Sequence, residues 1–201
     1  MVFKVCGMTD GDNIRDIENA GTDIIGFIFY PLSPRYLREV PGYLPATSQR
    51  AGVFVNEKLE IVEKNITCYK LDLVQLHGNE SPEYCAALYM KGYKIIKVFS
   101  IHTPDDLSET SLYHGLCDYF LFDTKCGGYG GSGKKFDWDI LHEYKGDTPF
   151  LLSGGIGPDS LNDLTRFRHP KLIGYDLNSR FEIQPGYKDA DLVKSFITRL
   201  T

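Results

Sequence analysis

The sequence predicts an α/β fold in which eight parallel strands and their connecting helices close into a (β/α)₈ barrel, the TIM-barrel architecture. Eight short apolar runs recur along the 201 residues. Most of the runs are continuous rather than alternating, which is typical of strands buried on both faces of a parallel sheet. Helix-like segments separate most of them, and such alternation indicates βαβ units. Because these barrels usually have ~250 residues, we expect a short version.

The strands are expected at residues 3–6, 23–29, 51–55, 71–76, 93–99, 118–122, 149–153 and 172–177. Helices are expected at residues 10–20, 56–65, 81–91, 157–167 and 188–200. Polar residues suited to capping stand at their starts, among them Asn56 and Ser81. Four prolines between residues 31 and 50 leave no room for a long helix, so the second helix should be degenerate. No linker interrupts the chain, and we expect one domain over residues 1–201.

Composition excludes several classes of protein. The formal net charge of −5 argues against binding to a nucleic-acid backbone, which usually needs a basic stripe. No stretch approaches the ~20 apolar residues that span a bilayer, and the N-terminus lacks a signal-peptide pattern. The five cysteines form no CxxC pair and show no zinc-ligand spacing with histidine. We therefore expect a cytoplasmic protein with free thiols, no metal site, and no nucleic-acid or membrane partner.

Chemically distinctive residues stand where most of these strands end. The first strand ends at Cys6 and Gly7, and later strand ends or the loops behind them carry Arg35, His77, Asp123, Gly154, Gly155, Asp176, Asn178 and Ser179. In (β/α)₈ barrels the active groups lie at the carboxyl ends of the strands. A turn is the ordinary explanation for any single glycine-rich loop. The recurrence at strand after strand, however, predicts an active site at this mouth of the barrel.

The segment SGGIG after the seventh strand predicts an anion site. Adjacent glycines allow backbone N–H groups to approach an anion, and the helix that follows adds a favourable dipole. The loops after the last two strands often hold phosphate in such barrels, and Asn178 with Ser179 would supply further donors. We therefore expect a phosphorylated small molecule as the ligand. The glycine-rich loop 126–135 would be a lid that excludes water, or a plain surface loop.

Seven segments together resemble the signature blocks of the phosphoribosylanthranilate isomerase family. They are KVCGMT, GFIFYPLSPRYL, AGVFVN, VQLHGNES, FDTKCGGYGGSGKKFDW, LLSGGI and DLNSRFEIQPGYKD, and they span residues 4–189 in the family's order. The resemblance implies an aldose–ketose isomerase of tryptophan biosynthesis, that is, an intramolecular oxidoreductase. Its reaction would be the Amadori rearrangement of N-(5′-phosphoribosyl)anthranilate to the 1-deoxyribulose phosphate isomer, with no cofactor and no metal.

The resemblance also implies roles for individual residues. Cys6 would be the general base and Asp123 the general acid, while Arg35 would contact the anthranilate. The phosphate would be held by Gly154, Gly155, Asn178 and Ser179. These residue types suit the chemistry. Opening the sugar ring needs a proton from a carboxylic acid whose pKa is raised by burial, and a thiol needs a nearby cation to become a thiolate base.

Strand periodicity adds an inference about Lys4, which lies two residues before Cys6 and therefore on the same face of the strand. A lysine buried one layer below the thiol needs a partner. Asp176 is the best candidate, because barrel closure makes the last strand a neighbour of the first. We hypothesise that Lys4 favours the Cys6 thiolate; the alternative is that Lys4 extends to water at the barrel floor. His77 would be a wall residue of the site or a hydrogen-bonding residue behind it.

The chain departs from the family in the last block, where Ser179-Arg180-Phe181-Glu182 replaces a common Ser-Gly-(Val/Ile)-Glu pattern. Arg180 would either bind the phosphate or point to solvent. Two alternative functions are a catalytically silent phosphate-binding barrel subunit and the related histidine-pathway isomerase, which carries a carboxylate at the position of Cys6. Cys6 and the short length disfavour the histidine-pathway isomerase, and the presence of both Cys6 and Asp123 disfavours the silent subunit. We expect a monomer or a homodimer.

Overall fold

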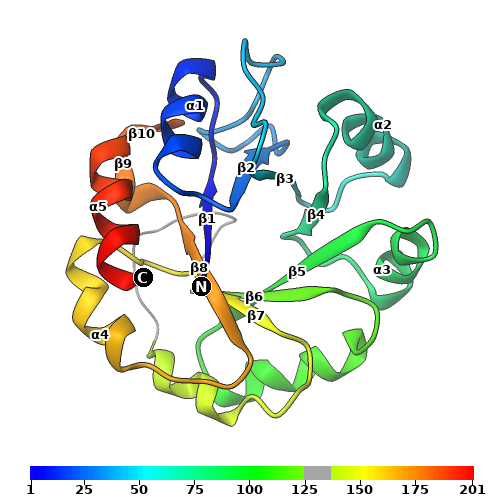
Figure 1. Cartoon of the computed structure of the whole chain (residues 1–201). Helices are drawn as coiled ribbons and strands as arrows, with labels where there is room; N and C mark the ends of the chain where they lie inside the picture. Colours follow the sequence, from blue (N-terminus) through cyan, green and yellow to red (C-terminus); the bar gives the residue numbers. More distant parts are fainter. Residues whose placement is uncertain (125–136) are drawn as a thin grey trace.

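The structure, a computed structural model, describes residues 1–124 and 137–201. Eight strands form a closed barrel in sequential order, and all neighbouring strands are parallel (Figure 1). The strands are β1 (Val2–Cys6), β2 (Ile24–Ile28), β3 (Gln49–Phe54), β4 (Leu73–Leu76), β5 (Lys94–Ile101), β6 (Tyr119–Thr124), β7 (Phe150–Leu152) and β8 (Leu172–Leu177). The predicted (β/α)₈ barrel is confirmed.

The connecting segments make the barrel short. The α-helices are α1 (Gly11–Asn19), α2 (Leu59–Tyr69), α3 (Pro82–Tyr89), α4 (Leu161–Arg166) and α5 (Ala190–Leu200). The 3₁₀ helices η1 (Pro104–Tyr113) and η2 (Trp138–Glu143) follow β5 and β6, and η3 (Pro158–Ser160) precedes α4. Residues 29–48, between β2 and β3, form no helix, which confirms the expected degenerate second helix. After β8 come η4 (Ser179–Phe181) and the short strands β9 (Glu182–Gln184) and β10 (Tyr187–Lys188).

Helix starts follow the capping residues in most cases. Side-chain caps are formed by Asp10, Ser81 and Asp189. The cap expected at Asn56 is wrong, because α2 begins only at Leu59 and Lys58 precedes it without a side-chain cap. Asn56 instead has a φ of 50°, and its Oδ1 accepts a hydrogen bond of 2.7 Å from the backbone N–H of Asn79. The Asn56 side chain therefore joins the loops that follow β3 and β4.

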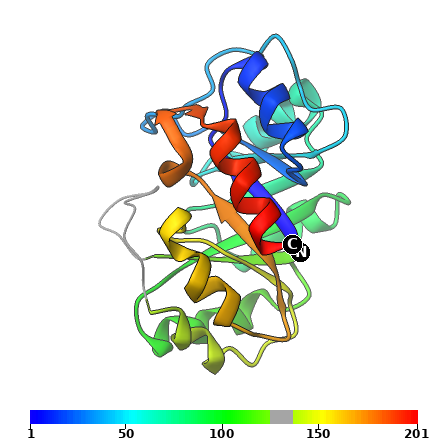
Figure 2. The ribbon, with the colours of Figure 1, turned by 60° about the vertical axis from the view of Figure 1, so that its left-hand side comes forward.

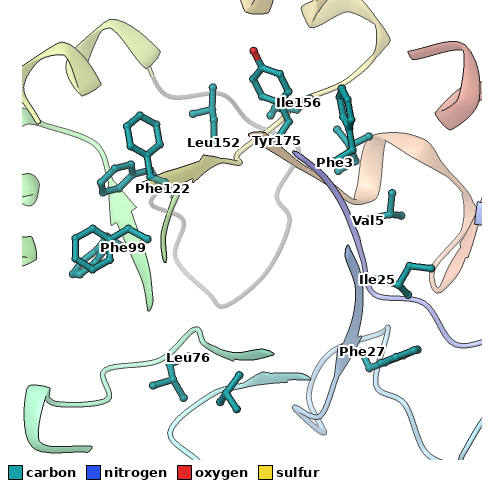
Figure 3. Close-up of a cluster of buried hydrophobic side chains, with 14 of the residues drawn as sticks. Phe3, Val5, Ile25, Phe27, Leu76, Phe99, Phe122, Leu152, Ile156 and Tyr175 are labelled. Carbon is teal, nitrogen blue, oxygen red and sulfur yellow. The ribbon is translucent and has the colours of Figure 1, made fainter. Parts of the chain in front are cut away.

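Apolar side chains fill both sides of the barrel wall. Between the strands and the helices lies a continuous core that includes Phe3, Ile25 and Phe122 (Figure 3). The interior of the barrel is filled by Ile24, Ala51, Leu73, Ile96, Val98, Leu121 and Leu151. Because this interior layer plugs the barrel, space for a ligand remains only near the ends of the strands.

Both ends of the chain lie side by side (Figures 1 and 2). β1 starts at Val2, and α5 runs back toward the same end of the barrel, where the strands begin. The mouth at which the strands end lies on the other side. In residues 1–124 and 137–201, no helix has the length and apolar character needed to cross a bilayer.

Candidate active site

A pocket opens at the carboxyl ends of the strands and encloses about 670 Å³, part of which is open to solvent. Eight of the nine residues predicted to form the site line it: Cys6, His77, Asp123, Gly154, Gly155, Asp176, Asn178 and Ser179. Arg35 is not among the lining residues. An apolar side is formed by Ile28, Val53, Val55 and Ile156. Closure of the barrel thus brings polar groups from both halves of the chain around one space.

Cys6 ends β1 with its side chain almost fully buried. Its strand partner is Gly26 on β2, where a Cβ atom would lie 2.8 Å from the sulfur, so a glycine leaves room for the thiol. Burial raises the pKa of the Cys6 thiol, and Asp176 adds to the rise, while the Lys4 ammonium lowers it. The thiol is therefore mainly protonated in the free pocket, with a cation beside it that eases its ionisation.

Lys4 makes the ion pair that strand periodicity predicts. Its Nζ lies 2.7 Å from Oδ1 of Asp176, and its side chain is 0% exposed, which rules out an extended route to water. The other carboxylate oxygen of Asp176 accepts a hydrogen bond of 3.2 Å from the hydroxyl of Ser153. Burial alone would lower the pKa of Lys4, but Asp176 and Cys6 outweigh it and the pKa is raised. Lys4 is therefore a fixed cation below the thiol.

Asp123 lies at the end of β6 and has the protonation behaviour of an acid catalyst. Burial raises the pKa of its carboxyl group to about 6, against a hydrogen bond of 2.8 Å from the backbone N–H of Thr124 that lowers it. The negative charge of Asp176 also raises this pKa. Gly154, with φ of 87°, packs on this strand end, where a Cβ would lie 3.2 Å from the Asp123 carboxylate. A carboxyl group with a pKa near 6 can hold a proton close to neutral pH.

His77 lines the pocket, the first of the two positions considered for it, and its Nε2 lies 3.6 Å from Oδ2 of Asp123. Burial lowers the pKa of the imidazole to about 4, with further contributions from Lys4 and Lys97. The ring is therefore neutral near pH 7. At 3.6 Å the two atoms are too far apart for a good hydrogen bond.

A buried ion pair that the sequence did not suggest supports the His77 loop. Lys97 Nζ lies 3.0 Å from Glu80 and donates a hydrogen bond of 2.7 Å to the carbonyl of Gly78. Glu80 also accepts hydrogen bonds from the backbone N–H groups of Asn56 and Gly78. The available signal was a lysine in the middle of the apolar run 93–99.

Arg35 reaches the site from the side. Its Nε lies 2.7 Å from Oε1 of Glu182, and its Nη2 lies 2.7 Å from Oε2 of the same carboxylate. The arginine stem passes Gly7, which has φ of 78° and where a Cβ would lie 2.6 Å from Cδ of Arg35. The glycine after Cys6 is thus required both by the backbone and by the arginine. The role of Arg35 as the anthranilate contact stays a prediction.

Lys188 is a second buried cation that sequence reasoning missed. Its Nζ lies 2.6 Å from Oε1 of Glu182 and donates a hydrogen bond of 2.7 Å to Oδ1 of Asn178. Burial lowers the pKa of Lys188, and its charge in turn lowers the pKa of Cys6. Glu182, whose pKa is lowered to about 2, thus holds two cations beside the pocket. The signal was the final block, in which Glu182 and Lys188 stand close together.

The predicted phosphate loops follow the neighbouring strands β7 and β8, and both line the pocket. Gly154 and Gly155 have positive φ, of 87° and 69°, and Ser179 starts η4 in the next loop. Arg180 is exposed, and its Nη2 lies 3.0 Å from Oδ1 of Asp159, so it links η4 to η3; a contact of Arg180 with phosphate stays a prediction. The expected lid, residues 126–135, lies outside the described residues.

A thiol, a carboxyl group with a raised pKa and the neighbouring loops after β7 and β8 meet at one barrel mouth, an arrangement that fits a (β/α)₈-barrel enzyme of acid–base chemistry. The site is built from side chains of one chain and surrounds a pocket sized for a small molecule. The family model described as N-(5'phosphoribosyl)anthranilate (PRA) isomerase matches residues 3–199, and the chain belongs to this family.

Individual relatives agree with this assignment. The chain is 51% identical to the N-(5'-phosphoribosyl)anthranilate isomerase of Parabacteroides distasonis, over 100% of this chain and 93% of the relative. The crystal structure of phosphoribosyl anthranilate isomerase from Thermotoga maritima superposes with a TM-score of 0.86 at 33% identity, covering 100% of this chain and 98% of that one. A further solved isomerase is in complex with reduced 1-(o-carboxyphenylamino)-1-deoxyribulose 5-phosphate. It has a TM-score of 0.82 at 30% identity, with 100% and 98% coverage.

Proposed function

We propose that the chain catalyses the isomerisation of N-(5′-phosphoribosyl)anthranilate to 1-(2-carboxyphenylamino)-1-deoxyribulose 5-phosphate, an Amadori rearrangement in tryptophan biosynthesis. The observation that carries this proposal is that Cys6 and Asp123 line one pocket and the pKa of Asp123 is raised to about 6. The ligand named in the solved relative's complex is a reduced form of this product, which supports the same substrate class.

Asp123 is the general acid of the first step. Its proton goes to the ring oxygen O4′ as the C1′–O4′ bond breaks, and the lone pair of the anthranilate nitrogen forms the C1′=N double bond of an iminium ion. Because the pKa of Asp123 is about 6, a useful fraction is protonated near neutral pH. A positioned acid of this strength typically contributes 10²- to 10⁴-fold, roughly, to the rate.

Cys6 is the general base of the second step. Its thiolate takes the proton from C2′, and the electron pair of that C–H bond forms the C1′=C2′ double bond of an enolamine, which neutralises the nitrogen. The enolamine then takes up a proton at C1′ and loses the hydroxyl proton at C2′, which gives the ketone. Lys4 stabilises the thiolate by its charge, since it lies on the same face of β1 and lowers the pKa of Cys6.

Binding groups surround these two residues. Backbone N–H groups of Gly154, Gly155 and Ser179, together with Asn178, hold the phosphate, and Arg35 holds the anthranilate carboxylate. The apolar side of the pocket receives the aromatic ring. Asp176 keeps Lys4 in place, and His77 borders the sugar next to Asp123. Positioning of this kind contributes to the rate because the entropy of bringing the groups together is lost on binding and not in the chemical step.

The test follows the loss of substrate fluorescence after the chain is mixed with freshly made phosphoribosylanthranilate. We expect Cys6→Ser and Asp123→Asn to lower kcat by roughly 10²- to 10⁴-fold. Matched controls are Cys68→Ser and Asp147→Asn, at an exposed thiol and an exposed carboxylate outside the pocket. A wild-type rate in either site variant removes that residue from the mechanism. No turnover by the wild-type chain would favour the silent phosphate-binding barrel.

We further propose that residues 1–201 work as one domain, as a monomer or a homodimer, and in the cytoplasm. A phosphorylated sugar does not cross membranes unaided, so its enzyme is expected where the substrate is made. Sedimentation of the purified chain at several concentrations measures the oligomeric state.

A further inference from the structure

Gln75 is a polar residue of the pocket that the proposed mechanism does not use. It lies on β4, lines the pocket, and is 1% exposed. Its side-chain oxygen Oε1 is buried, and within residues 1–124 and 137–201 it has no hydrogen-bond partner. An unpaired buried amide oxygen lowers the stability of a protein, so such a group needs an explanation.

Packing does not explain the carboxamide. Gln75 pairs in register with Val53 on β3 and Ile96 on β5, and Leu73 shares its face of the strand. Leu73 and Ile96 belong to the apolar layer that fills the barrel. An apolar side chain of similar size would suit these neighbours without leaving a polar atom unpaired. The amide of Gln75 therefore lowers the stability of the folded chain relative to an apolar side chain of similar size.

The position of Gln75 suggests what the amide oxygen binds. The apolar side of the pocket, with Val53 and Val55, adjoins it, and the acid Asp123 and the base Cys6 line the same space. His77 follows on the same face of β4, one layer nearer the mouth. Gln75 thus lies deep in the pocket, where the reacting end of a sugar must enter to meet both Asp123 and Cys6.

The chemistry of the ligand limits which of its groups can donate a hydrogen bond to the amide oxygen of Gln75. An amide oxygen accepts hydrogen bonds and therefore needs an N–H or O–H group. In phosphoribosylanthranilate the phosphate and the carboxylate are acceptors near neutral pH. The amine N–H lies next to its own ortho carboxylate, which accepts it within the molecule. The hydroxyl groups of the sugar remain as the free donors.

We propose that Gln75 is a substrate-binding residue whose amide oxygen accepts a hydrogen bond from a sugar hydroxyl that persists in the product and lies near C2′, the carbon from which Cys6 takes a proton. This inference rests on the proposed function for the identity of the sugar. Binding through a group that persists from substrate to product affects ground state and transition state alike, so its loss appears chiefly in KM.

The experiment measures activity and thermal stability on the same variants. Gln75→Met keeps the length of the side chain and removes the amide. We expect kcat/KM to fall about tenfold, mostly through KM, while the melting temperature stays equal or rises. The two changes in opposite directions separate ligand binding from a structural role, which would lower both. Gln75→Leu repeats the test if the methionine variant does not fold.

Thr22→Val is the matched control. Oγ1 of Thr22 is also buried without a hydrogen-bond partner in the described part of the chain, but Thr22 does not line the pocket. Its replacement should not lower the melting temperature and should leave kcat/KM unchanged. Equal kcat/KM values for wild type and Gln75→Met, or a melting temperature that falls together with kcat/KM, would overturn the proposal.

A second probe separates this inference from the isomerase activity. Ribose 5-phosphate has the sugar hydroxyls and the phosphate but no anthranilate. We expect it to raise the melting temperature of the wild-type chain, and to raise that of Gln75→Met less. If the wild type binds ribose 5-phosphate but does not turn over phosphoribosylanthranilate, the proposed function fails and the Gln75 comparison still decides the inference. Equal shifts in the two proteins, or no shift in either, refute the role of Gln75.

Discussion

The Arg35 guanidinium group donates two hydrogen bonds to the Glu182 carboxylate, each 2.7 Å long, although the two residues are 147 positions apart. Glu182 occupies the edge of the guanidinium group formed by Nε and Nη2. The edge formed by Nη1 and Nη2 remains for a second carboxylate, because a guanidinium group has five N–H donors in a planar fork. Glu182 therefore fixes the direction of the free edge of Arg35, which would receive the anthranilate carboxylate in the proposed function.

Glu182→Gln should weaken substrate binding. An amide can accept only through one oxygen, so Arg35 loses one of its two bonds and Lys188 loses its ion pair. We expect KM to rise about tenfold with a smaller change in kcat. Glu18→Gln is the control, since Glu18 also has a pKa near 2 and accepts hydrogen bonds from Thr47 and Ser48, but outside the pocket. Equal KM values for Glu182→Gln and wild type would contradict the positioning role.

Lys4→Met should make the Cys6 thiol harder to ionise. The substitution removes the cation that lowers the pKa of Cys6 and leaves the Asp176 carboxylate buried without its partner. Breaking a buried pair in this way typically costs about 3–5 kcal/mol of stability. The measurement is the rate of Cys6 alkylation against pH, read at this residue by mass spectrometry. An unchanged thiol pKa in the variant would refute the hypothesis that Lys4 favours the thiolate.

The pH dependence of kcat/KM should be a broad bell. The proposed mechanism needs Asp123 protonated and Cys6 ionised, although the pKa of Asp123 is about 6 and that of Cys6 lies above its ordinary value of 9.0. Below pH 6 the rate rises with pH because the thiolate fraction grows while Asp123 stays protonated. Between the two pKa values the gain in thiolate offsets the loss of protonated Asp123. Above the thiol pKa only the loss of the acid remains, and the rate falls.

The pH values at which kcat/KM begins to fall on each side of the profile test whether Asp123 and Cys6 are the two titrating groups. We expect the acid limb near pH 6 and the alkaline limb above pH 9. The acid limb should persist in His77→Gln, because the pKa of His77 is about 4 and its ring is already neutral at pH 6. An alkaline limb below pH 8 would mean that the thiol is not held in its protonated form.

Arg180 should act by linking the two phosphate loops. Its ion pair with Asp159 joins η4 to η3, and both side chains are exposed, so each variant should change stability by less than about 1 kcal/mol. Arg180→Gly, which restores the residue common in the family, should raise KM a few-fold by loosening the loops. Asp159→Asn should reproduce that change. If Asp159→Asn instead leaves KM unchanged while Arg180→Gly raises it, Arg180 contacts the phosphate directly.

The sequence predicted those parts of the site that depend on strand parity and barrel closure. Lys4 and Cys6 share a face because they are two residues apart, and closure places β8 beside β1, so the pairing of Lys4 with Asp176 could be deduced. Asp123 and His77 were predicted because each stands at the end of an apolar run. Periodicity and topology are sufficient for such positions.

Other parts of the site depend on the paths of loops, for which no periodic rule exists. Glu182 and Lys188 lie in the short strands β9 and β10 that follow β8, and Arg35, the partner of Glu182, lies in the proline-rich segment after β2. No periodic pattern in the sequence predicts the paths of these two segments or that they meet. The same limit applies to Asn56, whose side chain suits a helix cap but bonds across to the next loop instead.

The two chain ends are neighbours on the face of the barrel away from the catalytic mouth. A tether, an affinity tag or a fused partner at Met1 or Thr201 would project from that face and leave substrate free to enter. The same proximity suits a circularly permuted version, in which a short peptide joins the old ends and new ones are cut in the helix-free segment 29–48. In such a rearranged chain β8 and β1 would be consecutive strands, so the seam between them would become a contact between sequence neighbours.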